Sequence, residues 1–251
     1  MTQTNNLKSK LAERKHALGC FLLTGSPDNA EVLAHSGFDF LLIDHEHGCG
    51  DLGNAIAQMR AMKGTPTTSM LRVPSLDPAY FKRVLDSGVQ CIFCPMIESA
   101  PHAQAVVEAC WFPPHGIRGA GGATRASVYD YDADYSNRIR DELLIAVQIE
   151  SQRGVEHIEE IAAVSGIDLL VIGPRDLSAS IGKLGLFQDA EVLGLVARAE
   201  AAILKSGKYL GSVIYPGRTP AEMFENGYNM LIAGSDIGFL LEGARRALAV
   251  K

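Results

Sequence analysis

Eight short β-rich runs alternate with amphipathic helical segments along the 251 residues, and this alternation constrains the fold more than any other feature. The runs are almost continuously apolar, as in FLLID and LLVIG, which is typical of parallel strands buried on both faces. Eight repeats in a chain of this length indicate a (β/α)8 TIM barrel rather than an open sheet. The predicted strands begin at Leu18, Phe38, Pro66, Gln90, Leu143, Ile167, Tyr209 and Tyr228.

Helical segments are predicted between the strands, and two irregular stretches interrupt them. The helices are predicted over 30–35, 52–62, 79–86, 103–110, 155–164, 190–205, 220–225 and 237–250. The irregular stretches are 111–138 and 175–189, and long loops inside a compact domain are usually functional or disordered. No linker or second-domain boundary is visible, so residues 1–251 are predicted to form a single domain.

Composition excludes several classes of partner. The formal net charge is -6 and 47% of residues are hydrophobic, which suits a globular protein with a substantial core. No basic cluster offers a footprint for nucleic acid or for an anionic membrane surface. No apolar stretch reaches the roughly 18 residues that a membrane span needs. The polar start, MTQTNNLKSKLAERKH, lacks the apolar centre of a signal peptide, and a cytoplasmic location is therefore expected.

The five cysteines are expected to be free thiols, because their number is odd and no secretory signal is seen. Cys91 and Cys94 form a C-x-x-C pattern that could signal a metal or redox pair. The pattern falls within a predicted strand, where positions i and i+3 point to opposite faces. Two buried structural cysteines are therefore predicted.

Polar residues gather where four of the predicted strands end. The C-terminal ends of barrel strands form one rim, which holds the active site in barrel enzymes. Taken alone, Glu150 could be an acid at a helix N-terminus, Asp176 a helix cap and Arg72 a surface arginine. Their coincidence on one rim favours a functional site. The residues at these strand ends are Asp44, His45, Glu46, His47, Arg72, Gln148, Glu150, Arg175 and Asp176.

The residue types at this rim indicate metal-assisted enolate chemistry. Two carboxylates from neighbouring strands suit a hard divalent cation such as Mg²⁺ or Mn²⁺, which can stabilise an enolate. A fixed arginine can orient a carboxylate or keto oxygen, and a histidine beside an aspartate is a usual proton-transfer pair. A Schiff-base aldolase would need a lysine at the rim, and no predicted strand ends in lysine.

A zinc hydrolase is a weaker interpretation of the same rim. His45 and His47 share a strand face and could bind zinc together. No further histidine is expected at the rim, because His16, His35, His102, His115 and His157 lie in early, helical or loop segments.

At these residues the chain resembles the HpcH/HpaI-type class II pyruvate aldolases. LLIDHEHG is similar to a strand end of that family, MLRVP to its arginine strand, VQIES to its first metal carboxylate and IGPRDLSASIG to its second. VLDSGVQCIFCPMIESA and GIRGAGGATRAS also resemble family stretches, and the similarity extends from Leu18 to about Asp236. The resemblance implies a TIM barrel of the phosphoenolpyruvate/pyruvate type that makes or breaks a carbon–carbon bond between a 2-oxo acid and an aldehyde.

Transferred residue by residue, the resemblance implies a role for each matching position. Glu150 and Asp176 would bind a divalent metal, Mg²⁺, Mn²⁺ or Co²⁺. Arg72 would contact the keto or enolate oxygen. His47 would move protons, with Asp44 and Asp86 as the acidic partners that orient it. Substrate contacts, including backbone amides that hold the carboxylate, would come from Gln148, Gly173, Pro174, Arg175 and Ser178.

Two features of the resemblance leave questions open. His45 stands where related members often have glycine, and its effect on the site is not predicted. The loop around Arg118 and Arg125 is expected to meet the aldehyde end, without assigned roles.

The resemblance also implies partners and leaves alternatives. The expected ligands are a 2-oxo acid, pyruvate or hydroxypyruvate, and an aldehyde, and the expected assembly is a homo-hexamer built as a trimer of dimers. The C-terminal helix would cover its own barrel or a neighbour's. An acyl-CoA lyase of the citrate-lyase-like group is an alternative, although no clear basic surface is seen for the CoA phosphates. A non-catalytic 2-oxo acid binding barrel is another, against which the complete set of site residues argues.

Overall fold

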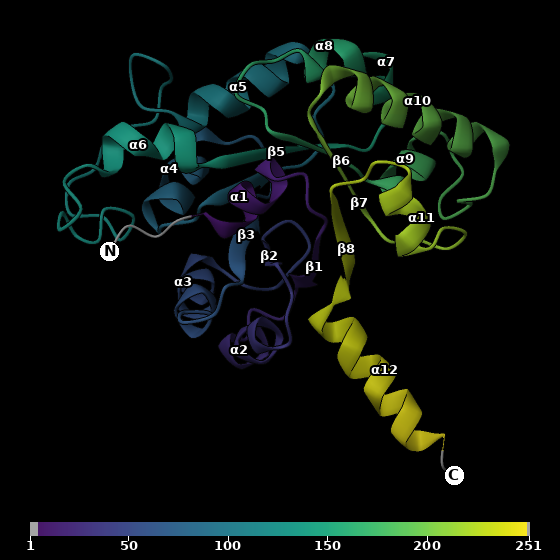
Figure 1. Cartoon of the computed structure of the whole chain (residues 1–251), viewed down its shortest axis with the longest axis horizontal. Helices are drawn as coiled ribbons and strands as arrows, with labels where there is room; N and C mark the ends of the chain where they lie inside the picture. The colour runs from purple at the N-terminus through teal and green to yellow at the C-terminus, as the bar shows by residue number, and fades with distance from the viewer. Residues whose placement is uncertain (1–4, 250–251) are drawn as a thin grey trace.

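The computed structural model describes residues 5–249 and contains a closed barrel of eight parallel strands surrounded by helices (Figure 1). Each strand pairs with the next along the chain, and β8 pairs with β1. The predicted (β/α)8 barrel is therefore confirmed. The strands are β1 Ala17–Leu22, β2 Phe40–Asp44, β3 Thr68–Arg72, β4 Cys91–Cys94, β5 Leu144–Ile149, β6 Leu169–Ile172, β7 Tyr209–Val213 and β8 Met230–Ser235.

The helices that surround the barrel begin and end close to the predicted segments, with three additions. The helix α1 precedes the first strand, and α6 and α9 form within stretches that were expected to be irregular. The segment predicted over 155–164 falls into two short helices that meet at His157. The helices are α1 Asn6–Ala12, α2 Pro27–His35, α3 Leu52–Ala61, α4 Pro78–Asp86, α5 Ala100–Cys110, α6 Tyr135–Glu142, α7 Gln152–Glu156, α8 Ile158–Ala162, α9 Pro174–Ser180, α10 Ala190–Ser206, α11 Pro220–Glu225 and α12 Asp236–Leu248.

Strand alternation divides the core into two shells. Phe40 and Leu42 of β2 belong to the cluster inside the barrel, whereas Leu41 and Ile43 belong to the shell between strands and helices. Every residue of β2 is buried, which is why its sequence is apolar without alternation. The same geometry separates Cys91, which faces the interior, from Cys94, which faces the helices. All five cysteines are free, as predicted.

The N-terminal end of the barrel is closed by α1. Its Leu7 and Leu11 are buried in the interior cluster beneath the strands. The Asn5 side chain caps the helix and donates a hydrogen bond to the Gln90 carbonyl at 2.9 Å. Because this end is filled by apolar side chains, a ligand can reach the barrel interior only from the opposite end.

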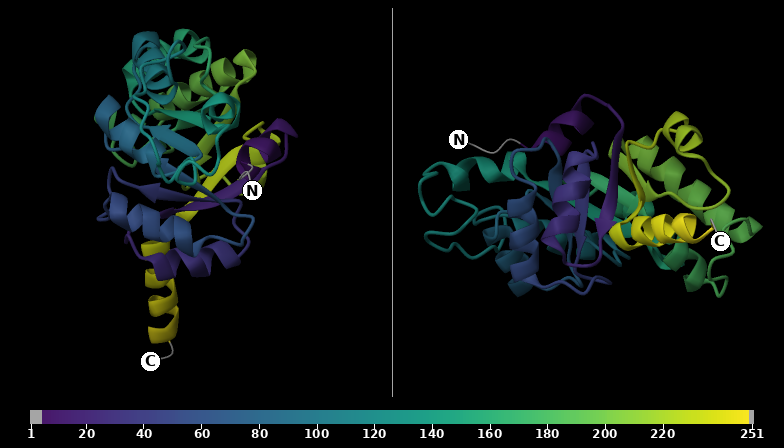
Figure 2. Two further views of the ribbon diagram at one scale, coloured as in Figure 1. Left: turned by 90° about the vertical axis from the view of Figure 1, so that its left-hand side faces the viewer. Right: turned by 90° about the horizontal axis from the view of Figure 1, so that it is seen from below.

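The C-terminal helix leaves the barrel instead of covering it. Figure 1 and the left view of Figure 2 show α12 projecting away from the strands. Asp236, at the base of the helix, is its only buried residue among those described, while Leu240 is 70% exposed and Leu241 is 49% exposed. Leu240, Leu241 and Leu248 recur at helical spacing, so α12 presents an apolar stripe to solvent.

Candidate active site at the C-terminal rim

The barrel interior changes from apolar to charged at the C-terminal ends of the strands. On β2 the inward series runs from Phe40 and Leu42 to Asp44, and on β3 it runs from Met70 to Arg72. The strand register places Asp44 directly beside Arg72. The same alternation on β5 leads from Ala146 to Gln148 and then Glu150, so one layer of polar side chains lies above the apolar interior.

Arg72 is held by a bidentate ion pair in this layer. Its Nε and Nη2 atoms donate hydrogen bonds to the two carboxylate oxygens of Asp44 at 2.9 and 2.7 Å. Both side chains are almost fully buried, and the guanidinium lies over the Phe21 ring, 5.0 Å from its centre. Burial opposes the charge of Arg72, but the carboxylates of Asp44 and Glu46 outweigh that effect and raise its pKa. Arg72 is therefore a fixed cation at the mouth of the barrel.

A chain of polar contacts joins Arg72 to Glu150. Arg72 Nη1 donates to the Gln148 side-chain oxygen at 3.3 Å, and Gln148 Nε2 donates to Glu150. The other Glu150 oxygen accepts the Met96 backbone N–H at 2.8 Å. Burial raises the pKa of Glu150 to about 7, the Met96 hydrogen bond opposes this, and the charges of Glu46 and Asp176 raise it further. This carboxyl is the most strongly perturbed acid of the rim, as expected for a functional group.

Three acids converge on the same opening. Glu46 forms an ion pair with Arg72 Nη1 at 2.8 Å. Burial raises the pKa of Glu46, Arg72 partly offsets this, and the charge of Asp176 adds to the upward shift. Asp176 lies in the first turn of α9, exposed to solvent, and its charge acts on both Glu46 and Glu150. Like charges gathered around one opening favour either protonation or a bound cation.

The donor set fits a hard divalent cation, although a closed set of ligands is not formed in this conformation. Among residues 5–249, no three His, Cys, Asp or Glu side chains stand at the spacing of a complete metal site. Glu46, Glu150 and Asp176 nevertheless offer carboxylate oxygens, the ligands that Mg²⁺ and Mn²⁺ prefer. The neighbours of Glu150 stabilise its ionised form only weakly, because its pKa lies far above the ordinary value. A cation would relieve the repulsion among these acids.

The two histidines of the DHEH stretch have different surroundings. His47 is 65% exposed, and its Nε2 lies 3.9 Å from a Glu46 carboxylate oxygen, so it is free to meet a ligand at the rim. His45 points outward from the barrel, where its Nδ1 pairs with the Tyr80 hydroxyl of α4 at 2.7 Å. Burial lowers the pKa of His45 despite the Asp44 charge. His45 therefore ties the end of β2 to α4 and does not enter the opening.

The stretch from Gly173 to Ser178 connects β6 to the rim. A Cβ at Gly173 would come within 2.6 Å of Gln148 Nε2 and 2.9 Å of the Glu150 Cβ, so only glycine allows this approach. Pro174 begins α9, and Arg175 and Asp176 of its first turn are exposed. The backbone N–H groups of a first helical turn have no partner within the helix. The substrate contacts of Gly173, Pro174 and Arg175 stay a prediction.

Ser178 lies behind the rim. Its hydroxyl is fully buried, donates to the Arg175 carbonyl at 2.7 Å and accepts the Gly185 N–H at 2.9 Å. Through these two hydrogen bonds Ser178 fixes the loop after α9. Its contact with a substrate carboxylate stays a prediction.

Asp86 and its neighbours lie at the other end of the molecule. Asp86 is the last residue of α4, just before β4 begins, and barrel helices run antiparallel to their strands. It accepts a hydrogen bond from Arg118 Nη2 at 2.8 Å, and among residues 5–249 it forms no ion pair with His47. The loop of Arg118 and Arg125 follows α5 and shares this end. Within one chain, therefore, the loop does not meet the predicted aldehyde end, and Asp86 does not orient His47.

Three residues that were given no role contribute to the rim. Glu46 was visible in the DHEH stretch, and its ion pair with Arg72 follows from the bend of the chain after β2. Met96 adopts a left-handed backbone conformation, with φ 56°, while its N–H contacts Glu150. Phe21 supplies the ring beneath Arg72. Of these, only Glu46 carried a signal in the sequence, because backbone donors and apolar surfaces leave no motif.

A parallel barrel with a fixed arginine, a perturbed carboxyl and converging acids at its C-terminal rim defines an enzyme of the TIM-barrel class. Residues 17–242 match the family described as HpcH/HpaI aldolase/citrate lyase, and the chain belongs to this family. The family assignment and the named relatives make it an aldolase, a carbon–carbon lyase.

Known proteins resemble the chain over nearly its whole length. A hydroxypyruvate/pyruvate aldolase of Roseovarius nubinhibens is 38% identical over 247 residues, which cover 98% of this chain and 96% of the relative. A 5-keto-4-deoxy-D-glucarate aldolase of Klebsiella pneumoniae is 36% identical, covering 93% of this chain and 91% of the relative. The solved structure of an HpcH/HpaI aldolase/citrate lyase family protein from Burkholderia cenocepacia superimposes with a TM-score of 0.93 at 36% identity, covering 98% of each chain.

No helix in the described part of the chain has the length and apolar character needed to cross a membrane.

Proposed function

We propose that the protein is a divalent-metal-dependent aldolase that joins the enolate of pyruvate or hydroxypyruvate to an aldehyde, and cleaves the product in reverse. The observation that carries the proposal is the connected set of Asp44, Arg72, Gln148 and Glu150 inside the rim. The relatives named for hydroxypyruvate, pyruvate and keto-deoxy-glucarate chemistry support the same substrate class. The free thiols are compatible with a reducing cytoplasm.

Glu150 and Asp176 are the proposed metal-binding residues, with Mg²⁺, Mn²⁺ or Co²⁺ as the ion. Glu150 is anchored by Met96 and Gln148, so one carboxylate is fixed while Asp176 enters from α9. When bound, the ion would supply Lewis acidity that polarises the keto group of a 2-oxo acid and favours its enolate. The backbone N–H groups of Arg175 and Asp176, in the first turn of α9, are proposed to bind the acid's carboxylate.

The chain's own residues then account for the proton and charge movements. Arg72 is aimed into the opening by Asp44, so its guanidinium can hold the keto oxygen while negative charge develops there. His47 is the proposed base that takes the C3 proton of the 2-oxo acid. The enolate carbon then attacks the aldehyde carbon, and the alkoxide that results takes a proton from the protonated His47, which restores both groups. Cleavage follows the same steps in reverse.

Aldol turnover tests this proposal directly. The purified protein is incubated with pyruvate or hydroxypyruvate and a panel of short hydroxyaldehydes, with Mg²⁺, Mn²⁺ or Co²⁺, and in parallel with EDTA. Adduct formation is expected only with the ion, and Glu150→Gln and Asp176→Asn should each reduce it at least about 100-fold. Glu31→Gln, an exposed acid of α2 far from the rim, is the matched control.

Turnover that persists in EDTA would refute metal dependence. A 2-oxo acid that binds without turnover would favour a non-catalytic barrel, and cleavage of an acyl-CoA ester instead would favour the lyase alternative.

We also propose that the protein assembles through α12, as part of a homo-hexamer. The apolar stripe of Leu240, Leu241 and Leu248 has no cover within the described chain, and another copy offers the same helix in return. In such an assembly the predicted pairing of Asp86 with His47 forms between two copies, because the two residues lie at opposite ends of one barrel.

Subunit mixing tests both parts of this assembly proposal. Leu240→Asp is expected to reduce the hexamer to smaller species in light scattering, whereas Glu242→Gln on the same helix should not. Asp86→Asn and His47→Asn are expected to be inactive alone, and mixed oligomers should regain activity at sites that receive both native residues. No recovery in oligomers shown to be mixed would contradict a pairing between copies.

A further inference from the structure

A second cavity lies at the end of the barrel opposite the chain's own catalytic rim. Its volume is about 290 Å³, and its walls come from the end of α3, the turn before β4, the loop after α5 and the helix α6. Gly88, Val89 and Gln90 lead into β4, which places the cavity near the N-terminal ends of the strands. It is therefore separated from Arg72 and Glu150 by the length of the barrel.

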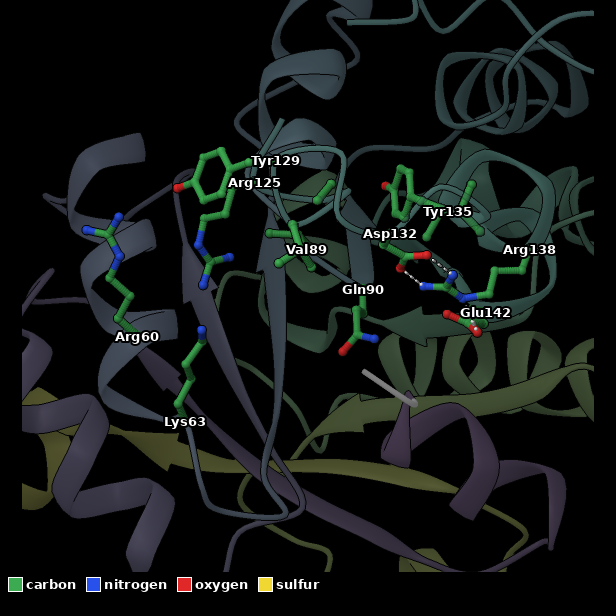
Figure 3. Close-up of a pocket in the computed structure, with 14 residues that line it drawn as sticks. Arg60, Lys63, Val89, Gln90, Arg125, Tyr129, Asp132, Tyr135, Arg138 and Glu142 are labelled. Atoms are coloured by element: carbon green, nitrogen blue, oxygen red, sulfur yellow. Dashed lines mark hydrogen bonds and ion pairs between the residues drawn. The ribbon is translucent and has the colours of Figure 1, made fainter. Parts of the chain in front are cut away.

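Three cations face one side of this cavity. Arg60 and Lys63 come from the end of α3, and Arg125 comes from the loop after α5; Figure 3 shows their side chains extending into the same space. In the described part of the chain, none of the three forms an ion pair with an acid. Arg125 is half-buried, and burial followed by the nearby charge of Arg60 lowers its pKa. The chain thus holds like charges together, although its overall charge is -6.

The acids of the cavity are already neutralised on its other side. Arg138 donates to Asp132 and, through Nε, to Glu142 at 2.9 Å, and Figure 3 shows these contacts across the cavity from Lys63. With four cations and two acids in its walls, the cavity keeps two positive charges in excess. The balance of charge is reversed at the rim at the opposite end, because several acids there share one arginine.

The walls hold one of these cations, Arg125, in a fixed position. Arg125 Nη1 donates to the Ser87 carbonyl and packs against Gly88, where a Cβ would come within 2.9 Å of it. The loop that carries Arg125 continues through three consecutive left-handed residues, Val128, Tyr129 and Asp130. Such backbone is costly for residues other than glycine and is found where a loop must hold a defined shape.

We propose that this cavity binds a small dianion, either a phosphate group or a pair of carboxylates, at a site distinct from the chain's own catalytic rim. Two guanidinium groups and an ammonium group are the donors that recognise such anions, and the excess of two charges matches them. A cavity of about 290 Å³ admits a ligand of metabolite size and excludes a macromolecule.

A purely structural interpretation makes a different prediction. The helices α3 and α4 both end here, and cations stabilise the C-terminal ends of helices. On that interpretation, Arg125 serves only the Ser87 carbonyl, and Arg60 and Lys63 are merely exposed. Phosphate would then have no saturable effect, and replacing either exposed cation would change nothing but surface charge.

Calorimetric titration of the full-length protein distinguishes the two. Inorganic phosphate and succinate are the probes, titrated at constant ionic strength set with sodium chloride. Saturable binding of at least one is expected, and Arg60→Gln and Lys63→Gln should each weaken it roughly tenfold, because a charge-assisted hydrogen bond is lost. Lys205→Gln, an equally exposed lysine at the end of α10, is the matched control and should leave binding unchanged. The probe with the lower Kd identifies the chemistry of the ligand.

Two results would overturn the proposal. One is the absence of saturable binding of both probes. The other is binding that Arg60→Gln and Lys63→Gln leave unchanged while Arg72→Gln abolishes it, which would place the anion at the catalytic rim. Because the readout is binding and not turnover, failure here leaves the proposed aldolase activity untouched.

Discussion

The two ends of the barrel use charge in opposite ways. At the C-terminal rim, the acids Asp44, Glu46 and Glu150 surround one arginine, Arg72. The acids outnumber the arginine, and the pKa of Glu150 is raised. At the N-terminal end, Arg60, Lys63 and Arg125 face a cavity whose acids are already paired. An excess of acids suits a cation and an excess of bases suits an anion. The two ends of the barrel therefore differ in the sign of the charge that their own side chains leave unpaired.

The largest effect is expected from breaking the ion pair at the rim. Asp44→Asn removes the bidentate partner of a buried guanidinium, and we expect kcat to fall about 100- to 1000-fold, because Arg72 loses its orientation. Unfolding free energy should also fall by about 3 kcal/mol, since Arg72 remains buried with a weaker partner. Steady-state kinetics and chemical denaturation measure the two effects. Asp28→Asn on α2 is the control, and an unchanged kcat in Asp44→Asn would show that Glu46 alone positions Arg72.

The next effect concerns the pH dependence of stability without metal. The pKa of Glu150 is about 7 in the folded protein and 4.5 ordinarily. Between pH 4.5 and 7, therefore, the folded protein keeps a proton on Glu150 that the unfolded chain has lost. Stability should therefore fall as pH rises from about 4.5 to 7, by ~3 kcal/mol at most, and then level off. Thermal unfolding in EDTA measures this. Adding Mn²⁺ should restore stability above pH 7, because the ion binds the ionised carboxylate.

Glu150→Gln is the control for that pH profile. The amide cannot titrate, so the fall between pH 4.5 and 7 should disappear and added Mn²⁺ should have little effect. A profile that keeps its slope in Glu150→Gln would assign the titration to another group, of which Glu46 is the first candidate, since burial raises its pKa as well.

The sequence predicted the fold and most of the rim because both follow from strand pattern. Continuous apolar runs identify buried parallel strands, and their polar last residues, such as Asp44 and Arg72, must meet where the strands end. The helix α1 was missed because it is short, and its apolar content is only Leu7, Leu11 and Ala12. The helices α6 and α9 were missed because long irregular segments flank them.

The places of Asp86 and Ser178 could not be predicted for a different reason. Their roles were assigned from resemblance, which gives a residue's role but not its place within one chain. Asp86 stands at the C-terminal end of a helix, so the antiparallel course of barrel helices already places it away from the rim. Ser178 lies only two residues after Asp176, yet its side chain turns into the protein and holds Gly185. Burial of one polar atom within a loop cannot be read from spacing.

Gly173 packs closely against two side chains of the rim. Gly173→Ala would push a Cβ into Gln148 and Glu150, and the contact at 2.6 Å forces both side chains to shift. We expect a fivefold to 50-fold weaker affinity for Mn²⁺ and a loss of about 1–3 kcal/mol in unfolding free energy. Gly243→Ala, where a Cβ meets nothing within 4 Å, is the control. An unchanged metal affinity would mean that Gln148 does not position Glu150.

Gly88 provides the matching test at the opposite end, with the smallest expected effect. Its φ is +92°, and a Cβ there would come within 2.9 Å of the Arg125 guanidinium, which is the flexible end of a long side chain. Gly88→Ala should cost about 1 kcal/mol in backbone strain and weaken phosphate binding about threefold, because Arg125 is displaced but not removed. The contrary result is a phosphate affinity that stays the same while stability falls. Arg125 would then stabilise only the end of α4, and Arg60 and Lys63 alone would bind the anion.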